Sequence, residues 1–444
     1  MRNMSVLWEM WAYRPPHQLE DTEPLPKFKG LRHQAGYNLP RELHRLDDLL
    51  DENDDLDPVL SLRNKPHTDF NPIWDVGTET ASADDIIMAA MEATAHDQIA
   101  AVTSDLAQAA AGTLPLMVCR KQLYLQAGTV WTPLDKADFI LAYQQDPRIR
   151  NALHSFSGHG LNDLYKKVLI QPSIQRDIKD VQMPPSLIPC RDGVFDLETM
   201  RPRNVRPDDY FFSCCDVPVD EIGEGSGKHF ENFLAFVGEG NPVIRQQILE
   251  MIGVIISGYM PKKFFLLLGP RDTGKSQIMN LLRNLIGDQC TQSISDPNEL
   301  SGPWMSGSLI GKRLCYCPDA ARVTFSQKSA AALKQLTGDD LIQANIKYKQ
   351  PLTFRNEAKI VFVSNYPLMI PRDEAVESRI LTIPFSVSIP KERQIPHFSE
   401  LLYRERGYIV GAAIEALKDL ADRHFQFTRA DSVTQVPTCA FGGS

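Results

Sequence analysis

Short apolar runs alternate with amphipathic segments through the second half of the chain. The runs predict strands at residues 264–268, 359–364 and 379–384, and a further strand that ends at residue 317. Residues 327–336 show the spacing of a helix. Strands that alternate with helices are typical of a mainly parallel sheet covered by helices. The pattern therefore predicts an α/β fold for this part of the chain.

The segments on either side follow other patterns. Two alternating segments around Gln126-Ala127-Gly128 predict a hairpin, and Asp192-Gly193 predicts a turn between two further apolar runs. Helices are predicted over 84–111, over 230–257 with an interruption at 238–242, and over 398–420. The closing residues, PTCAFGGS, predict a loose tail.

A chain of 444 residues exceeds what one hydrophobic core usually organises, so several domains are expected. Residues 1–75 are rich in proline and charged residues, which predicts an extended or disordered, flexible arm. We expect a smaller α+β domain over 76–225 and a helical collar over 226–258. The α/β domain then covers 259–390, and a helical segment with the tail covers 391–444.

Composition narrows the classes of partner and compartment. The net charge is −9, so a nucleic-acid partner would be held in a local groove or pore rather than on a general basic surface. The longest apolar stretch is interrupted at 261–263, and the chain does not begin with a secretory leader pattern. We therefore expect no membrane partner and a location in the cytoplasm.

The eight cysteines include no CxxC pair, which argues against a zinc finger or a thioredoxin-like site. Cys315 and Cys317 alternate within an apolar run, and Cys214-Cys215 lie beside two phenylalanines. These surroundings predict buried, reduced thiols that pack rather than bind metal.

The segment FFLLLGPRDTGKSQIMNLL combines a strand, a glycine-rich loop and a helix. Two glycines permit the backbone turn, and the loop amides and the helix N-terminus can face phosphate groups. Lys275 can reach β- and γ-phosphate oxygens, and the Ser276 hydroxyl can hold Mg²⁺. The sequence therefore predicts a P-loop for ATP and Mg²⁺, whose nucleotide-contacting residues are Gly269, Pro270, Arg271, Asp272, Thr273, Gly274, Lys275, Ser276 and Gln277.

A P-loop enzyme also needs a carboxylate on a neighbouring strand to orient Mg²⁺ and water. Asp319 follows an apolar strand and is the predicted acidic residue and metal ligand, but Ala320 follows where many such enzymes carry a second acid. Two interpretations stay open. Either Asp319 holds the metal while Glu299, Asp339 or Asp340 acts as the base, or Asp319 is itself the base.

Two further polar residues lie at strand ends. Asn365 stands at the tip of an apolar strand, where an amide can sense the γ-phosphate or position water, although asparagine is also a common turn residue there. Arg379 starts the next strand and could enter a neighbouring subunit's phosphate site as an arginine finger. The alternative for Arg379 is a surface ion pair with Glu374 or Glu377.

Five segments occur in the order and approximate spacing of superfamily 3 helicases: GPRDTGKS, RLCYCPDA, LKQLTGDDLIQANIKYKQPLTF, AKIVFVSNYP and DEAVESRILTIPF. Together they resemble the poxvirus-type primase-helicase C-terminal domain of phages, plasmids and mobile genetic elements. The segment IPCRDGVFDLETM and the segment around Trp131 resemble the domain that precedes it. The resemblance covers residues 115–425 and implies an AAA+-like P-loop NTPase core over 259–390, assembled as a hexameric ring around DNA.

The resemblance also implies roles for individual residues. Lys275 and Ser276 would bind nucleotide and Mg²⁺, and Asp319 would be the acidic motif. Asn365 would be the polar sensor, and Arg379 would be the finger supplied to the next subunit.

The family further carries a DNA-contacting hairpin between the acidic motif and the sensor, a place that IKYKQ occupies here. On a strand, Lys347 and Lys349 point to one face and can meet backbone phosphates, while Tyr348 can pack or stack. Outside the family context, the same residues would be read as a solvated edge strand.

These observations predict an ATP-dependent replicative DNA helicase, 3′ to 5′ by family resemblance, that translocates on single-stranded or forked DNA of a virus or mobile element. The N-terminal region shows no primase signature, so a primase, polymerase or single-strand binding protein would be a separate partner. The alternative is an ATP-dependent oligomeric DNA-binding or assembly module that recruits replication proteins and unwinds little. A more distant alternative is a defence or packaging NTPase.

Overall fold

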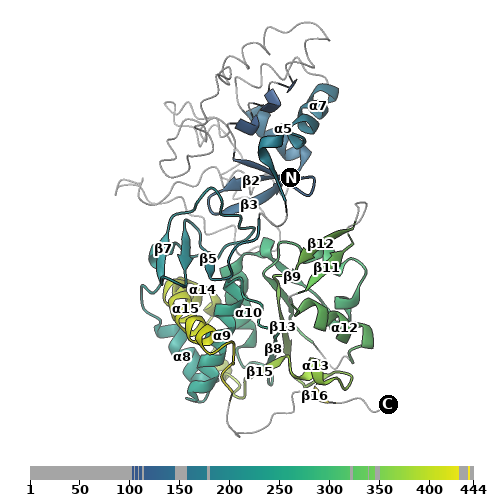
Figure 1. The fold of residues 1–444 in the computed structure, drawn as a ribbon. Helices are drawn as coiled ribbons and strands as arrows, with labels where there is room; N and C mark the ends of the chain where they lie inside the picture. Colours follow the sequence, from purple (N-terminus) through teal and green to yellow (C-terminus); the bar gives the residue numbers. More distant parts are fainter. Residues whose placement is uncertain are drawn as a thin grey trace. The chain divides into compact units, whose positions relative to one another are not determined.

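The structure is a computed structural model that describes residues 103–104, 106–108, 110–112, 115–145, 158–177, 181–320, 324–338, 340–345, 351–429 and 439–440 (Figure 1). The predicted arm at 1–75, most of the predicted helix at 84–111, and Lys347, Tyr348 and Lys349 lie outside these residues. The chain forms two compact units. The first reaches to Gln182 and includes Asn204–Phe212, and the second comprises Met183–Arg203 and the chain from Ser213 onward. The division into five segments stays a prediction.

The first unit contains a four-stranded sheet in the order β3-β2-β1-β4. Its strands are β1 (Leu116–Cys119), β2 (Gln122–Ala127), β3 (Val130–Leu134) and β4 (Gln175–Arg176), and β1, β2 and β3 pair antiparallel in sequence. The short helix η5 (Pro172–Ile174) and the helices α5 (Lys136–Gln145) and α7 (Gly158–Leu169) complete its described elements. A core that includes Leu123, Leu125, Phe139, Leu164 and Val168 joins this sheet to the helices.

The predicted hairpin around Gly128 is confirmed by the pairing of β2 with β3. The segment before it was expected to be one strand, and this was wrong because the chain turns at Arg120-Lys121 to form β1 and β2. Both turn residues have positive φ, at 52° and 61°. Such a turn normally carries Gly, Asn or Asp, so its composition conceals it.

The second unit opens with a small antiparallel sheet of β5 (Leu187–Pro189), β6 (Val194–Asp196) and β7 (Arg201–Arg203). The turn predicted at Asp192-Gly193 connects β5 to β6, as expected. The main sheet of this unit has five strands: β8 (Phe264–Leu268), β9 (Thr291–Ser293), β10 (Leu314–Cys317), β13 (Lys359–Ser364) and β15 (Ile380–Pro384). They are all parallel and run in the order β15-β8-β13-β10-β9, which confirms the predicted parallel sheet.

Successive residues of these strands point to opposite faces of the sheet, so each face packs against its own set of helices. Phe265 and Leu267 face a core shared with α8 (Lys228–Val237), α9 (Pro242–Ile256), α10 (Lys275–Ile286), α14 (Phe398–Arg404) and α15 (Arg406–Asp422). Phe264, Leu266 and Leu268 face a second core shared with α11 (Met305–Ser308), α12 (Gln327–Leu336) and the hairpin of β11 (Leu341–Ala344) and β12 (Leu352–Arg355). Two covered faces explain why β8 is apolar at every position.

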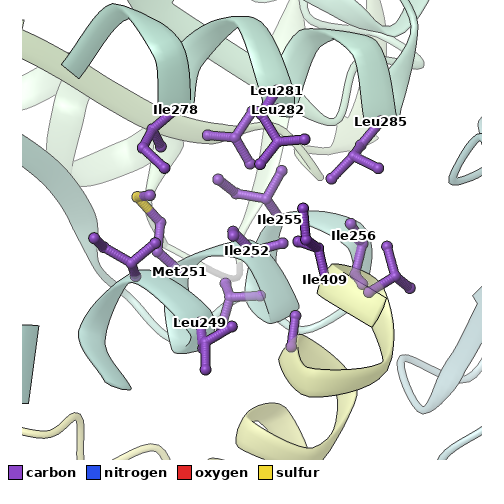
Figure 2. Close-up of a cluster of buried hydrophobic side chains, with 14 of the residues drawn as sticks. Leu249, Met251, Ile252, Ile255, Ile256, Ile278, Leu281, Leu282, Leu285 and Ile409 are labelled. Atoms are coloured by element: carbon purple, nitrogen blue, oxygen red, sulfur yellow. The ribbon is translucent and has the colours of Figure 1, made fainter. Parts of the chain in front are cut away.

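The first of these cores is built on α9, whose residues from Gln247 to Ile256 are all buried and are apolar apart from Gln247, Glu250 and Gly253. The buried Glu250 carboxylate is paired with Arg423. Figure 2 shows Met251, Ile252 and Ile255 of α9 directed toward Ile278 and Leu282 of α10. The predicted helices at 230–257 are confirmed as α8 and α9, and the helix predicted at 398–420 is confirmed with a break at Glu405.

The remaining short elements of the unit connect these layers: η6 (Val219–Glu221), η7 (Asp288–Cys290), η8 (Pro297–Ser301), β14 (Leu368–Met369), α13 (Glu374–Glu377), η9 (Lys391–Arg393) and β16 (Cys439–Ala440). The closing residues were expected to be loose throughout, which was wrong for Cys439-Ala440, because β16 pairs with β14. Backbone hydrogen bonds to a strand far away in the sequence are not visible in local composition. Within the described residues, every helix is too short or too polar to cross a membrane.

Candidate nucleotide site

The predicted phosphate loop connects the end of β8 to the start of α10. The Gly269 amide donates to the Ser364 carbonyl oxygen at 3.1 Å, which holds the loop against the end of β13. Gly274 stands immediately before the first residue of α10. Its φ is +89°, a backbone conformation that residues with a side chain rarely adopt. The sequence spacing therefore produces a tight loop that ends at a helix N-terminus, where backbone amides favour anions.

Gly269 is required for a different reason, which gives a first prediction. A Cβ atom there would lie 1.9 Å from the Phe385 carbonyl oxygen, a backbone atom that follows β15. We expect Gly269→Ala to force the two strand ends apart and to cost about 2 kcal/mol of folding free energy. Calorimetry should record a Tm roughly 5 °C lower.

The matched control is Gly112→Ala, because an added Cβ meets nothing within 4 Å there. Its Tm should stay unchanged or rise slightly. An unchanged Tm for Gly269→Ala would show that the strand ends are not packed as closely as described.

Lys275 is the first residue of α10 and is only 6% exposed. Its ammonium donates to the Gly269 carbonyl oxygen at 2.7 Å, and also to the Pro270 carbonyl oxygen and the Thr273 hydroxyl. Burial lowers the pKa of this ammonium, while the nearby carboxylates of Asp272 and Asp319 act to raise it. The side chain therefore places a positive charge inside the loop, surrounded by acceptors that an anion's oxygens could replace.

Asp319 and Asn365 follow the ends of two other parallel strands. Asp319 lies just beyond β10, and Asn365 lies just beyond β13, which pairs with both β10 and β8. The carboxyl ends of parallel strands meet at one edge of a sheet, and this edge is where ligands bind in open α/β folds. Sheet order thus brings together residues that are far apart in the sequence.

One cavity of about 620 Å³ joins these residues. Of the residues predicted to be functional, Lys275, Ser276, Asp319 and Asn365 line it, as do the loop residues Arg271, Asp272, Thr273, Gly274 and Gln277. Its volume lies within the range usual for small-molecule sites. The sequence did not predict the other walls, which come from α8 and from residues 389–398. No spacing rule links those segments to the loop, so no local signal could have identified them.

The residues that line the cavity also indicate which carboxylate could act as the catalytic base. Among its described lining residues, the carboxylates are Asp272 and Asp319. The Glu299 carboxylate instead accepts from the amides of Ser295 and Asp296 at the start of η8, and Asp340 stands just before β11. Asp339 lies outside the described residues. Geometry therefore favours Asp319 over Glu299 and Asp340, while the chemical role of each stays a prediction.

Arg379 is not among the residues that line this cavity. Its guanidinium donates to the Lys334 carbonyl oxygen at 2.6 Å and to the Thr337 hydroxyl at 2.8 Å, both at the C-terminal end of α12. A cation at this end of a helix also interacts favourably with the helix dipole. Its predicted role in a neighbouring subunit stays a prediction.

The seven cysteines whose side chains the structure describes are free of disulfides. Cys215, Cys315 and Cys317 are buried, as expected, whereas Cys214, which was also expected to be buried, is only partly buried. Burial raises the pKa of Cys315 to about 12 and that of Cys317 to about 11. These thiols are therefore protonated packing groups at neutral pH. No group of three or more His, Cys, Asp or Glu side chains with metal-binding geometry is found in the described part of the chain.

Two family matches cover much of the described chain. Residues 79–238 match the family described as "D5 N terminal like", which includes the Trp131 segment and the segment from Ile188. Residues 267–379 match DUF5906, described as a family of unknown function, and this range contains the loop, Asp319 and Asn365.

Similar proteins are also found by sequence and by structure. A protein named "Putative helicase" in Acanthamoeba polyphaga mimivirus is 29% identical over 207 residues, which are 45% of this chain and 22% of that protein. The apo C-terminal region of NrS-1 superposes with a TM-score of 0.45 and 11% sequence identity, over 71% of this chain and 72% of its own. The A form of the same region superposes with a TM-score of 0.45 and 10% sequence identity, over 71% of each chain. Those structural likenesses are too weak to support an argument. The chain is similar, over parts of its length, to the D5 N-terminal-like family and to a viral helicase.

Proposed function

We propose that this protein is an ATP-dependent replicative DNA helicase of a virus or mobile genetic element. One observation carries the proposal: a single cavity gathers the loop, Lys275, Ser276, Asp319 and Asn365 at the carboxyl edge of a parallel sheet. This is the set of groups that nucleoside triphosphate hydrolysis needs. The named helicase among the similar proteins supports DNA unwinding as the use of that hydrolysis.

In this proposal the loop binds the triphosphate of ATP. Gly274 and the first turn of α10 present backbone amides to the phosphate oxygens, and Lys275 exchanges its carbonyl partners for the β- and γ-phosphates. Hydrolysis spreads negative charge over the γ-phosphoryl oxygens, so a buried ammonium beside them stabilises the transition state more than the ground state.

Mg²⁺ fits the side chains that are present. Ser276 and Asp319 both line the cavity and offer a hydroxyl and a carboxylate, the hard oxygen donors that this ion prefers. A magnesium ion bound with nucleotide takes most of its other ligands from phosphate and water, so two protein ligands suffice. When bound, it would neutralise charge on the β- and γ-phosphates. Asp319 and Asn365 would then orient the attacking water.

The proposal includes a ring, and the family resemblance implies that this ring is a hexamer. Arg379 lies outside its own subunit's cavity, which is the arrangement an arginine finger acting on a neighbour requires. Its present bonds to α12 would couple that helix to the state of the neighbouring site. Mass photometry with ATP and forked DNA tests the ring directly.

The DNA contact is proposed at the hairpin of β11 and β12. These strands pair antiparallel on either side of residues 346–350, so Lys347, Tyr348 and Lys349 belong to their connection. Two lysines and an aromatic residue suit single-stranded DNA, where cations meet phosphates and rings stack on bases. Translocation would run 3′ to 5′.

The test combines ATPase and strand-displacement assays on forked DNA with either 3′ or 5′ single-stranded arms. The wild-type protein should displace the strand from the fork with a 3′ arm. The double variant Lys347→Ala, Lys349→Ala should keep its basal ATPase but lose stimulation by DNA on the order of tenfold, more so at higher salt. If DNA stimulates the ATPase of the wild-type protein and of the double variant equally, the hairpin is not the DNA contact.

The alternative is an oligomeric assembly module that binds ATP and DNA, recruits a primase, polymerase or single-strand binding protein, and unwinds little. The surroundings of Ala320 support this alternative. Ala320 is 1% exposed, its amide donates to the Val363 carbonyl oxygen, and its own carbonyl oxygen accepts from the Ser364 hydroxyl. A carboxylate at this position would be buried in the core that contains Ala320 and would carry a desolvation cost. ATP-dependent assembly on DNA without strand displacement from either fork would select this alternative.

A further inference from the structure

The cavity beside the loop has two halves of different chemistry. The phosphate half comprises residues 271–277 with Asp319 and Asn365. The apolar half is formed by side chains of α8 and of residues 389–398, principally Phe233, Phe236, Ile389, Ile395 and Phe398. The proposed hydrolysis uses the first half only, so the second half requires its own explanation.

The apolar half exposes surface that folding normally buries. Phe236 is partly exposed on α8, and Ile395 is 50% exposed, although both line the same cavity. The polar groups beside them are the amides of Asn232 and Gln394, the imidazole of His229 and the guanidinium of Arg393, and the lining residues from these two segments include no carboxylate. Flat apolar walls with a few amide groups suit a heteroaromatic ring, which stacks by its faces and forms hydrogen bonds at its edge.

The apolar half is attached directly to the phosphate loop. The Ile389 amide donates to the Asp272 carbonyl oxygen at 2.6 Å, and the Ser388 hydroxyl donates to the Arg271 carbonyl oxygen at 3.1 Å. On the other wall, a Cβ placed on Gly274 would lie 2.6 Å from the Phe233 ring, so this aromatic residue packs on the loop itself. A ligand that is bound at the loop and extends into the cavity would therefore meet these walls.

The two apolar walls are also attached to each other. The rings of Phe233 and Phe398 lie 5.5 Å apart, a normal aromatic contact. The Glu405 carboxylate accepts from the amides of His229 and Phe230, which ties the first turn of α8 to the junction of α14 and α15. The walls are thus preorganised rather than formed by the ligand.

We infer that the apolar half holds the adenine base of the nucleotide, with Phe236 and Ile395 providing the stacking surface. The inference rests on the proposed function, because the triphosphate must occupy the loop for the base to reach these residues. It assigns base recognition to two segments that lie outside the five motif segments. It also makes residues 389–398 responsible for distinguishing a nucleotide from bare polyphosphate.

The test compares binding of ATP and of inorganic tripolyphosphate, each with Mg²⁺, by calorimetry on the full chain. Phe236→Ala and Ile395→Ala should each weaken ATP binding on the order of tenfold, the loss expected for one stacking contact, and leave tripolyphosphate binding unchanged. Lys275→Ala should weaken both ligands. The control is Ile170→Ala, because Ile170 is 73% exposed in the other unit and should affect neither.

Each remaining outcome has a defined meaning. If the wild-type chain binds tripolyphosphate as tightly as ATP, or if neither variant weakens ATP binding, the base site is overturned and the phosphate site stands. If the two variants weaken both ligands equally, they act on the loop and the base site is again overturned. If the wild-type chain binds neither ligand, the proposed function itself fails.

Discussion

Lys275→Ala should abolish ATP hydrolysis and strand displacement, lowering kcat/KM for ATP a hundredfold or more, on the order of the effect of removing a preorganised transition-state contact. The buried ammonium lies within the loop and within the field of Asp272 and Asp319. Among the described residues that line the cavity, Lys275 is the one lysine, and the two arginines there, Arg271 and Arg393, are exposed rather than buried inside the loop. A malachite-green phosphate assay and a fluorescent forked-DNA assay measure the two losses.

Lys275 also bridges the carbonyl oxygens of Gly269 and Pro270, so the variant must be shown to fold. A Tm close to that of the wild type would separate a chemical effect from loss of structure. The control substitution is Lys418→Ala, because that lysine pairs with Asp422 on α15 and does not line the cavity. Its ATPase should be unchanged. Substantial unwinding by the Lys275→Ala protein would exclude the helicase proposal.

Asp319→Asn should reduce the rate of hydrolysis on the order of a hundredfold or more while nucleotide binding persists. The substitution preserves shape but removes the carboxylate proposed to hold Mg²⁺ and to orient water. Because the loop and Lys275 are proposed to bind the phosphates, the expected loss is in kcat rather than in affinity. Single-turnover hydrolysis and equilibrium binding of ATP distinguish the two.

Asp272→Asn is the matched control for Asp319→Asn. Both are carboxylates that line the same cavity, but Asp272 lies in the loop with φ of 58°, a conformation that asparagine adopts readily. It should therefore fold normally and lose little activity. If Asp272→Asn loses as much hydrolysis as Asp319→Asn, then Asp272 shares the role of the base. If Asp319→Asn hydrolyses ATP at the wild-type rate, the acidic residue has been assigned wrongly.

The local elements around the site follow from the sequence because their signals are local. Helix α12 begins and ends where its spacing predicted, and the Ser326 side chain caps it by accepting from the Ser329 amide. Strand β13 also matches its predicted bounds, since a run of consecutive apolar residues between polar ends is typical of a strand covered on both faces. In contrast, the Arg120-Lys121 turn and the pairing of β16 depend on backbone conformation and distant partners that composition does not report.

The conformation of the loop between β8 and α10 was determined by the sequence alone, because Gly269, Gly274, Lys275 and the flanking apolar runs act within one continuous segment. The tertiary structure decided which other groups meet it. Placing β13 between β8 and β10 brings Asp319 and Asn365 to the loop, and folding α8 and residues 389–398 over the same edge adds the apolar walls. Strand order and long-range packing depend on how whole faces bury one another, and no short segment of the chain encodes that choice.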